Sequence, residues 1–127
     1  MSYDLDVLAG DLDRDEATWT PLDLDVARAT LAGLPGAVAV DDEVTWELDG
    51  AAVTFTLAVD DGGVLRAVGA TVTDGIDPSA RERDVRRVLE VLLDLADRLG
   101  ARVHDQQLGA DVEPATVEES VRSFAGG

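Results

Sequence analysis

The sequence predicts an α+β protein, with a mainly antiparallel sheet of 4–5 strands, two main helices on one face and a short C-terminal helix. Two turn sequences, Asp49–Gly50 and Asp60–Gly63, separate segments in which apolar and polar residues alternate. This pattern is typical of hairpins in a half-buried sheet. Apolar residues recur at helical spacing in two other regions, and this order of elements favours helices packed on an antiparallel sheet. A length of 127 residues indicates a single domain over residues 1–127.

The first segments of the chain predict a strand followed by a helix. Tyr3–Leu8 alternates between apolar and acidic residues, as a half-buried strand does. The acidic stretch Asp11–Thr20 has no regular pattern. Asp23 and Asp25 follow a proline and provide start signals for a helix that we expect to run to about Gly33.

The middle of the chain predicts an antiparallel meander. Its strands are Val44–Leu48, Val53–Val59 and Val64–Val72, joined by the two turn sequences. We expect Asp49–Gly50 to form a tight turn because both residue types tolerate a positive φ. A further short strand at Ala37–Val40 is an option, with Asp41–Asp42 as its turn.

The second half contains the clearest helical pattern. We expect a helix from about Pro78 to Leu99, capped by Asp77 at its start and by Gly100 at its end. Its predicted buried stripe comprises Val85, Val88, Leu89, Leu92, Ala96 and Leu99. A strand at 101–108 and a short helix over residues 113–124 complete the prediction.

Composition excludes several classes of function. The chain has 27 acidic and 10 basic residues and a formal net charge of −17, whereas nucleic-acid binding needs clustered positive charge. It has no Cys, and all its basic residues are Arg, so thiolate and Schiff-base chemistry lack their residues. His104 is the single His. We therefore expect no enzymatic activity, no cofactor and no metal site.

Hydropathy predicts a folded protein of the cytoplasm. A hydrophobic content of 46% and a mean hydropathy of +0.02 are too high for an acidic disordered chain. No apolar run approaches the roughly 18 residues of a membrane span, and no basic region precedes an apolar run at the start. We expect no interaction with membranes.

The acidic charge is concentrated in the first half. Residues 1–63 carry a net charge of −13, and residues 64–127 a net charge of −4. Such asymmetry is expected of an interface for a basic partner, and Trp19 within the acidic stretch could serve as its aromatic anchor. The predicted partner-binding residues are Asp11, Asp13, Asp15, Glu16, Trp19, Asp41, Asp42 and Glu43.

Two other groups of residues suggest different chemistry. Asp11, Asp13 and Asp15 have the spacing of a calcium loop, but the loop's essential Gly and bidentate Glu are missing, so we interpret them as a solvated acidic loop. His104 and Asp105 could perform general acid–base work in a small enzyme or bind a small molecule. Neighbouring strand residues point to opposite faces, however, which favours a structural or surface role for this His.

Two segments carry a resemblance to known proteins. Met1–Val7, with the sequence MSYDLDV, and Leu95–Gln107, with the sequence LADRLGARVHDQQ, together span 20 of 127 residues. They resemble a group of small bacterial α+β proteins that begin with a Ser-Tyr-Asp-Leu strand and end with a helix and a strand closing in Asp-Pro-Gln. This chain has Gln106 in place of the Pro. Several members of the group look like immunity proteins of polymorphic toxins, and the resemblance implies no catalytic residues.

The leading hypothesis is an acidic, non-enzymatic binding protein that neutralises a basic protein partner, as an immunity protein of a bacterial toxin system does. One alternative is a structural or assembly module or a homodimer, in which the acidity serves only solubility. Another is a small enzyme or small-molecule binder that uses His104 with Asp105.

Overall fold

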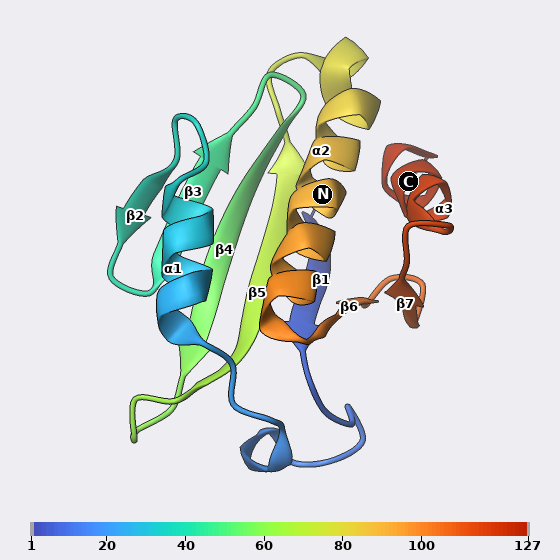
Figure 1. The fold of residues 1–127 in the computed structure, drawn as a ribbon. Coiled ribbons are helices and arrows are strands. Elements are labelled where there is room, and N and C mark those ends of the chain that lie inside the picture. Colours follow the sequence, from blue (N-terminus) through green and yellow to red (C-terminus); the bar gives the residue numbers. More distant parts are fainter. Residues whose placement is uncertain (1, 127) are drawn as a thin grey trace.

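The structure, a computed structural model, describes residues 2–126 (Figure 1). Its strands are β1 (Ser2–Leu8), β2 (Val38–Val40), β3 (Glu43–Glu47), β4 (Ala51–Val59), β5 (Leu65–Asp74), β6 (Arg102–Asp105) and β7 (Ala110–Val112). Its α-helices are α1 (Leu24–Ala32), α2 (Arg81–Leu99) and α3 (Val117–Gly126). Two 3-10 helices, η1 (Glu16–Thr18) and η2 (Pro78–Ala80), lie in the connections.

The strands form one sheet in the order β2-β3-β4-β5-β1-β6-β7, and each neighbouring pair is antiparallel. The α+β class and the antiparallel sheet are confirmed. The predicted count of 4–5 strands is wrong, because the sheet has seven. The first strand in sequence lies inside the sheet, between β5 and β6.

The strand count was too low for two reasons: the optional strand at Ala37–Val40 does form, as β2, and the end of the chain turns back on itself to add β7. The segment predicted as one strand over 101–108 ends at Asp105. The Asp105 carboxylate accepts hydrogen bonds from the backbone N–H groups of Gln107 and Leu108, at 3.0 and 3.1 Å, and so begins a turn. Gly109 then adopts a φ of 63°, which favours glycine, and the chain returns as the three-residue strand β7.

The helices cover one face of the sheet. Figure 1 shows α1 and α2 side by side on this face, with α3 beside α2. The largest fully buried side chains lie between these layers and include Trp46, Phe55, Leu5, Leu31, Leu89 and Leu92. The opposite face carries polar side chains such as Asp4, Thr54 and Thr71, which occupy facing positions on β1, β4 and β5.

The long helix α2 begins later than predicted. Asp77 caps the first turn as expected, because its carboxylate accepts from Ser79 N–H at 3.0 Å, but this turn is the 3-10 helix η2. Gly100 ends α2 in the left-handed conformation with a φ of 66°, as predicted. Similarly, α3 begins at Val117, because Thr116 Oγ1 accepts from Glu113 N–H and residues 114–116 form a turn.

The turn between β3 and β4 confirms the predicted hairpin, but for a different physical reason. Neither Asp49 nor Gly50 has a positive φ. A Cβ on Gly50 would lie 2.2 Å from the backbone carbon of Ala80, so glycine is required by close packing of the turn against η2. Gly50 N–H donates to the buried Asp84 carboxylate at 2.7 Å, which joins this hairpin to α2.

Candidate acidic interface

Three acidic connections lie at the same end of the sheet. Because neighbouring strands are antiparallel, the segment after β1, the β2–β3 turn and the β4–β5 turn meet at this end, together with the start of α1 (Figure 1). We call this region the acidic end. Its acidic residues are Asp11, Asp13, Asp15, Glu16, Asp23, Asp25, Asp41, Asp42, Glu43, Asp60 and Asp61.

Most carboxylates of the acidic end are not neutralised by a cation. Arg14, Arg28 and Arg66 pair with Asp11, Asp42 and Asp60 at N–O distances of 3.8, 3.0 and 3.1 Å. Within residues 2–126, the other acidic residues of the set have no ion pair. The acidic end therefore presents a negative potential that the protein itself leaves largely uncompensated.

The segment from Gly10 to Thr20 is held in one conformation by hydrogen bonds. Asp15 caps η1 by accepting from Ala17 N–H at 3.2 Å, and the Asp11 carboxylate accepts from Asp13 N–H at 2.9 Å. From the sheet, Arg66 donates to the carbonyl of Trp19 at 2.9 Å, and Arg102 donates to the carbonyl of Gly10 at 2.6 Å. These contacts give the exposed carboxylates a fixed scaffold.

Trp19 has a structural role in this segment. Its Nε1–H donates to the carbonyl of Asp11 at 2.8 Å, and its ring lies so close to Gly10 that a Cβ there would be 2.4 Å from Trp19 Cδ1. The side chain is half-buried. The predicted anchor residue thus folds back onto its own segment, and only part of the indole is available to a partner.

A shallow cavity of about 330 Å³ joins this segment to the β4–β5 turn, with Asp15 and Glu16 on one side and Asp60 and Arg66 on the other. The pKa of Asp60 is lowered, mainly because its carboxylate accepts from Val64 N–H, with further contributions from Arg66 and Gly62 N–H. Asp60 therefore stays ionised and holds its own turn in place.

The second predicted group lies at the edge of the acidic end. Asp41 occupies the β2–β3 turn with a φ of 53°, a conformation that Asp tolerates better than most residues. Arg28 of α1 pairs with Asp42, and the carbonyl of Asp42 accepts from Leu57 N–H at 2.7 Å. In the sheet order, β4 and β5 lie between this turn and the end of β1, so the two predicted groups share one end of the sheet without touching.

The prediction missed four acidic residues of this end, namely Asp23, Asp25, Asp60 and Asp61. The sequence showed them only as helix-start and turn signals. Asp60 and Asp61 lie beside the predicted residues because β4 pairs with β5 and β5 pairs with β1. Asp23 and Asp25 come to this end because Leu22 pairs with Leu65 at the start of β5. The acidic turn sequence Asp60–Asp61 could have indicated this part of the acidic end, but only if the antiparallel strand order had been known. That order places the β4–β5 turn and the segment after β1 at the same end of the sheet.

His104 and Asp105 do not form a joint site. Asp105 is fully buried and bonded to Tyr3 and Ser120, whereas His104 lies on the opposite face with its Nδ1 3.4 Å from Asp111. Within the described residues, no three His, Asp or Glu side chains converge in a geometry that could hold a metal ion.

Comparisons with known proteins add no relative. No family model matches the chain, and searches of the curated proteins and of the solved structures find no match. Among residues 2–126, no helix is both long enough and apolar enough to cross a membrane.

Proposed function

We propose that this protein is a non-enzymatic binding protein whose acidic end docks on a basic protein partner. The observation that carries the proposal is that uncompensated carboxylates from three connections and the start of α1 gather at one end of the sheet. Long-range attraction of this kind speeds the encounter with a basic surface, and close contacts then set the residence time.

The partner class that fits best is a bacterial toxin with a basic active-site surface, which the chain would block as an immunity protein. The resemblance of the two segments described above supports this class. In the fold those segments are neighbours, because β1 pairs with β6 and Val7 lies opposite Val103. They form the framework of the sheet, and the acidic end extends from it.

The test uses the product of the neighbouring gene as the partner. We expect it to form a complex with this chain and, if it is toxic, to lose its toxicity on coexpression. A variant with Asp13→Asn, Asp15→Asn and Asp41→Asn should associate about tenfold more slowly at low salt, and with a weaker salt dependence. Asn keeps the cap of Asp15 and tolerates the positive φ of Asp41. Asp42 is left unchanged because its removal would release Arg28.

The matched control removes the same charge elsewhere, with Glu47→Gln, Glu90→Gln and Glu119→Gln. These residues are exposed and have no ion pair within the described chain. The control should associate nearly as fast as the wild type. Equal slowing of both variants, or a complex that leaves the acidic end accessible, would show that another surface binds.

A second candidate is a homodimer formed through the sheet edge. β2 is an edge strand of three residues, and its Val38 and Val40 side chains are 61% and 63% exposed. Exposed apolar edge strands are ready to pair with another strand. Light scattering decides between the candidates. A dimer that persists on dilution and is lost in a Val40→Lys variant favours the edge, whereas a monomer leaves the acidic end as the functional surface.

A further inference from the structure

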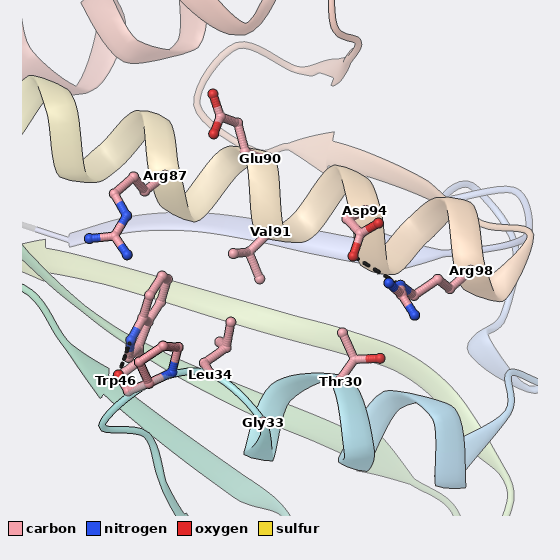
Figure 2. Close-up of a pocket in the computed structure, with 10 residues that line it drawn as sticks. Thr30, Gly33, Leu34, Trp46, Arg87, Glu90, Val91, Asp94 and Arg98 are labelled. Carbon is pink, nitrogen blue, oxygen red and sulfur yellow. Dashed lines mark hydrogen bonds and ion pairs between the residues drawn. The ribbon is translucent and has the colours of Figure 1, made fainter.

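A cavity lies away from the acidic end, in a groove between α1 and α2 (Figure 2). Its volume is about 440 Å³, which lies within the range of small-molecule sites. Thr30 and Leu34 line it on the α1 side, and Val91 lines it on the α2 side. Trp46 and Arg87 form one end, and Asp94 and Arg98 form the other.

Arg87 differs from the other arginines around it. Arg81, Arg83 and Arg86 each pair with a carboxylate, as the excess of acid in this chain would predict. Arg87 is exposed and has no ion pair within residues 2–126. Its guanidinium instead lies 5.3 Å from the centre of the Trp46 ring. This cation–π contact positions the guanidinium and leaves its N–H donors available.

The Trp46 side chain, over which the Arg87 guanidinium lies, is held in place. Trp46 is 2% exposed, and its Nε1–H donates to the carbonyl of Pro35 at 3.0 Å. This hydrogen bond joins β3 to the segment that follows α1. The cation at the mouth of the groove is therefore held by a fixed side chain, and a ligand would lose little further freedom on binding it.

Besides Arg87, the charged side chains that line the groove are Glu90, Asp94 and Arg98, and the buried Asp84 lies close enough to Arg87 to interact with it electrostatically. Figure 2 shows Leu34 and Val91 facing each other beyond Trp46, while Glu90 points away from them. At the far end, Asp94 and Arg98 neutralise each other at an N–O distance of 2.9 Å. The groove thus offers one cation that forms no ion pair within the described residues, next to an apolar middle.

We propose that this groove binds a small organic carboxylate with an apolar body. The carboxylate accepts two hydrogen bonds from the Arg87 fork, and the aromatic or branched aliphatic body lies between Leu34 and Val91. The site is independent of the acidic end, since none of its lining residues belongs to that set.

The experiment follows the two indole N–H signals by two-dimensional 15N–1H NMR, since the chain has only Trp19 and Trp46. The probes are 3-phenylpropanoate and the neutral 3-phenylpropanamide. We expect the carboxylate to shift the Trp46 signal saturably and to leave the Trp19 signal in place. The amide should bind at least about tenfold more weakly, because it cannot form the charge-assisted hydrogen bonds that the carboxylate forms with Arg87.

Two variants with the same loss of charge test the role of Arg87. Arg87→Gln should weaken binding of 3-phenylpropanoate about tenfold or more. Arg122→Gln on α3, where the wild-type side chain is also exposed and without an ion pair in the described chain, should bind as the wild type does. The spectrum of each free variant reports whether it is folded. Equal affinity for acid and amide, unchanged binding by the Arg87 variant, or no saturable shift of Trp46 would overturn the proposal.

Discussion

Asp105 is the residue on which most of the buried hydrogen bonding depends. Its fully buried carboxylate accepts from the hydroxyl of Tyr3, from Ser120 Oγ at 2.9 Å, and from two backbone N–H groups of the β6–β7 turn. Burial, followed by the bond to Asp105, raises the pKa of Tyr3, so the tyrosine remains a protonated donor. The carboxylate thereby links β1, β6 and α3 with neutral donors alone.

This role could not be predicted from the sequence. Asp105 drew attention only as the neighbour of His104, and its hydroxyl partners Tyr3 and Ser120 lie 102 and 15 residues away along the chain. Alternation in a strand did predict that the two neighbours point to opposite faces, and this prediction is confirmed. The alternation of residues in the strand thus predicted the face to which the Asp105 side chain points. Its hydrogen-bond partners depend on contacts between residues far apart in the sequence.

The first prediction concerns this cluster. Asp105→Ala removes the acceptor that two buried hydroxyls and two turn N–H groups share, so it should lower the free energy of unfolding by about 3 kcal/mol. Ser120→Ala removes one donor and should lower it by about 1 kcal/mol. Urea unfolding measures both effects. Asp97→Ala, at an exposed helical position without an ion pair in the described chain, is the control. Similar urea midpoints for the Asp105 and Asp97 variants would contradict the role assigned to Asp105.

At the scale of elements, strong local patterns predicted well, the short edge strand β2 was predicted only as an option, and the short edge strand β7 was missed. On α2, Glu82 pairs with Arg86 and Asp94 pairs with Arg98, at N–O distances of 3.4 and 2.9 Å, because residues four apart face each other on a helix. β7 was missed because three residues are too few to show alternation. Its only local signals were Asp105, which caps the turn, and Gly109, which takes the positive φ.

A bidentate ion pair attaches α3 to α2. Arg86 Nε and Nη2 each donate to a carboxylate oxygen of Glu118 at 2.7 Å. This interaction raises the pKa of Arg86 and lowers that of Glu118 below its ordinary value of 4.5, chiefly through the hydrogen bond itself. Since the folded-state pKa of Glu118 is lowered, the stability that its carboxylate contributes is present above pH 4.5. This stability is lost as the pH falls through the folded-state pKa.

The second prediction follows from this sign. Glu118→Gln should lower the melting temperature near neutral pH, and the difference from the wild type should shrink as the pH is reduced from about 6 to about 3. Thermal unfolding by circular dichroism, repeated across this range, measures the difference. The neighbouring Glu119→Gln, at an exposed position without an ion pair in the described residues, should show no such convergence. A constant difference between Glu118→Gln and wild type at all pH values would exclude the ion pair as its cause.

At the scale of the whole molecule, the fold turns an asymmetry in sequence into an asymmetry in space. Five arginines of the second half pair with acids of the same half, as in Arg81–Asp74 and Arg102–Asp111. Most acids of the first half collect at one end of the sheet, the exceptions being Asp4, Asp6, Glu47 and Asp49. Charge counting predicted an acidic region in the first half. The strand order, which decides that residues 11–16, 41–43 and 60–61 share one end, depends on pairings such as β1 with β5 that no local pattern reveals.

The third prediction concerns the self-repulsion of this charge. A net charge of −17 opposes the compact state, and raising NaCl from about 0.01 to about 0.15 M shortens the screening length from about 30 to about 8 Å. The melting temperature should therefore rise, by about 4 °C for each kcal/mol of relieved repulsion. The variant with Asn at positions 13, 15 and 41 should rise less than the control with Gln at positions 47, 90 and 119, because its removed charges lay at the acidic end, among other carboxylates without an ion pair. A melting temperature that falls as NaCl is added would show that the arginine ion pairs outweigh the repulsion. An equal rise in melting temperature with NaCl for the two variants would show that repulsion at the acidic end is no stronger than on the rest of the surface.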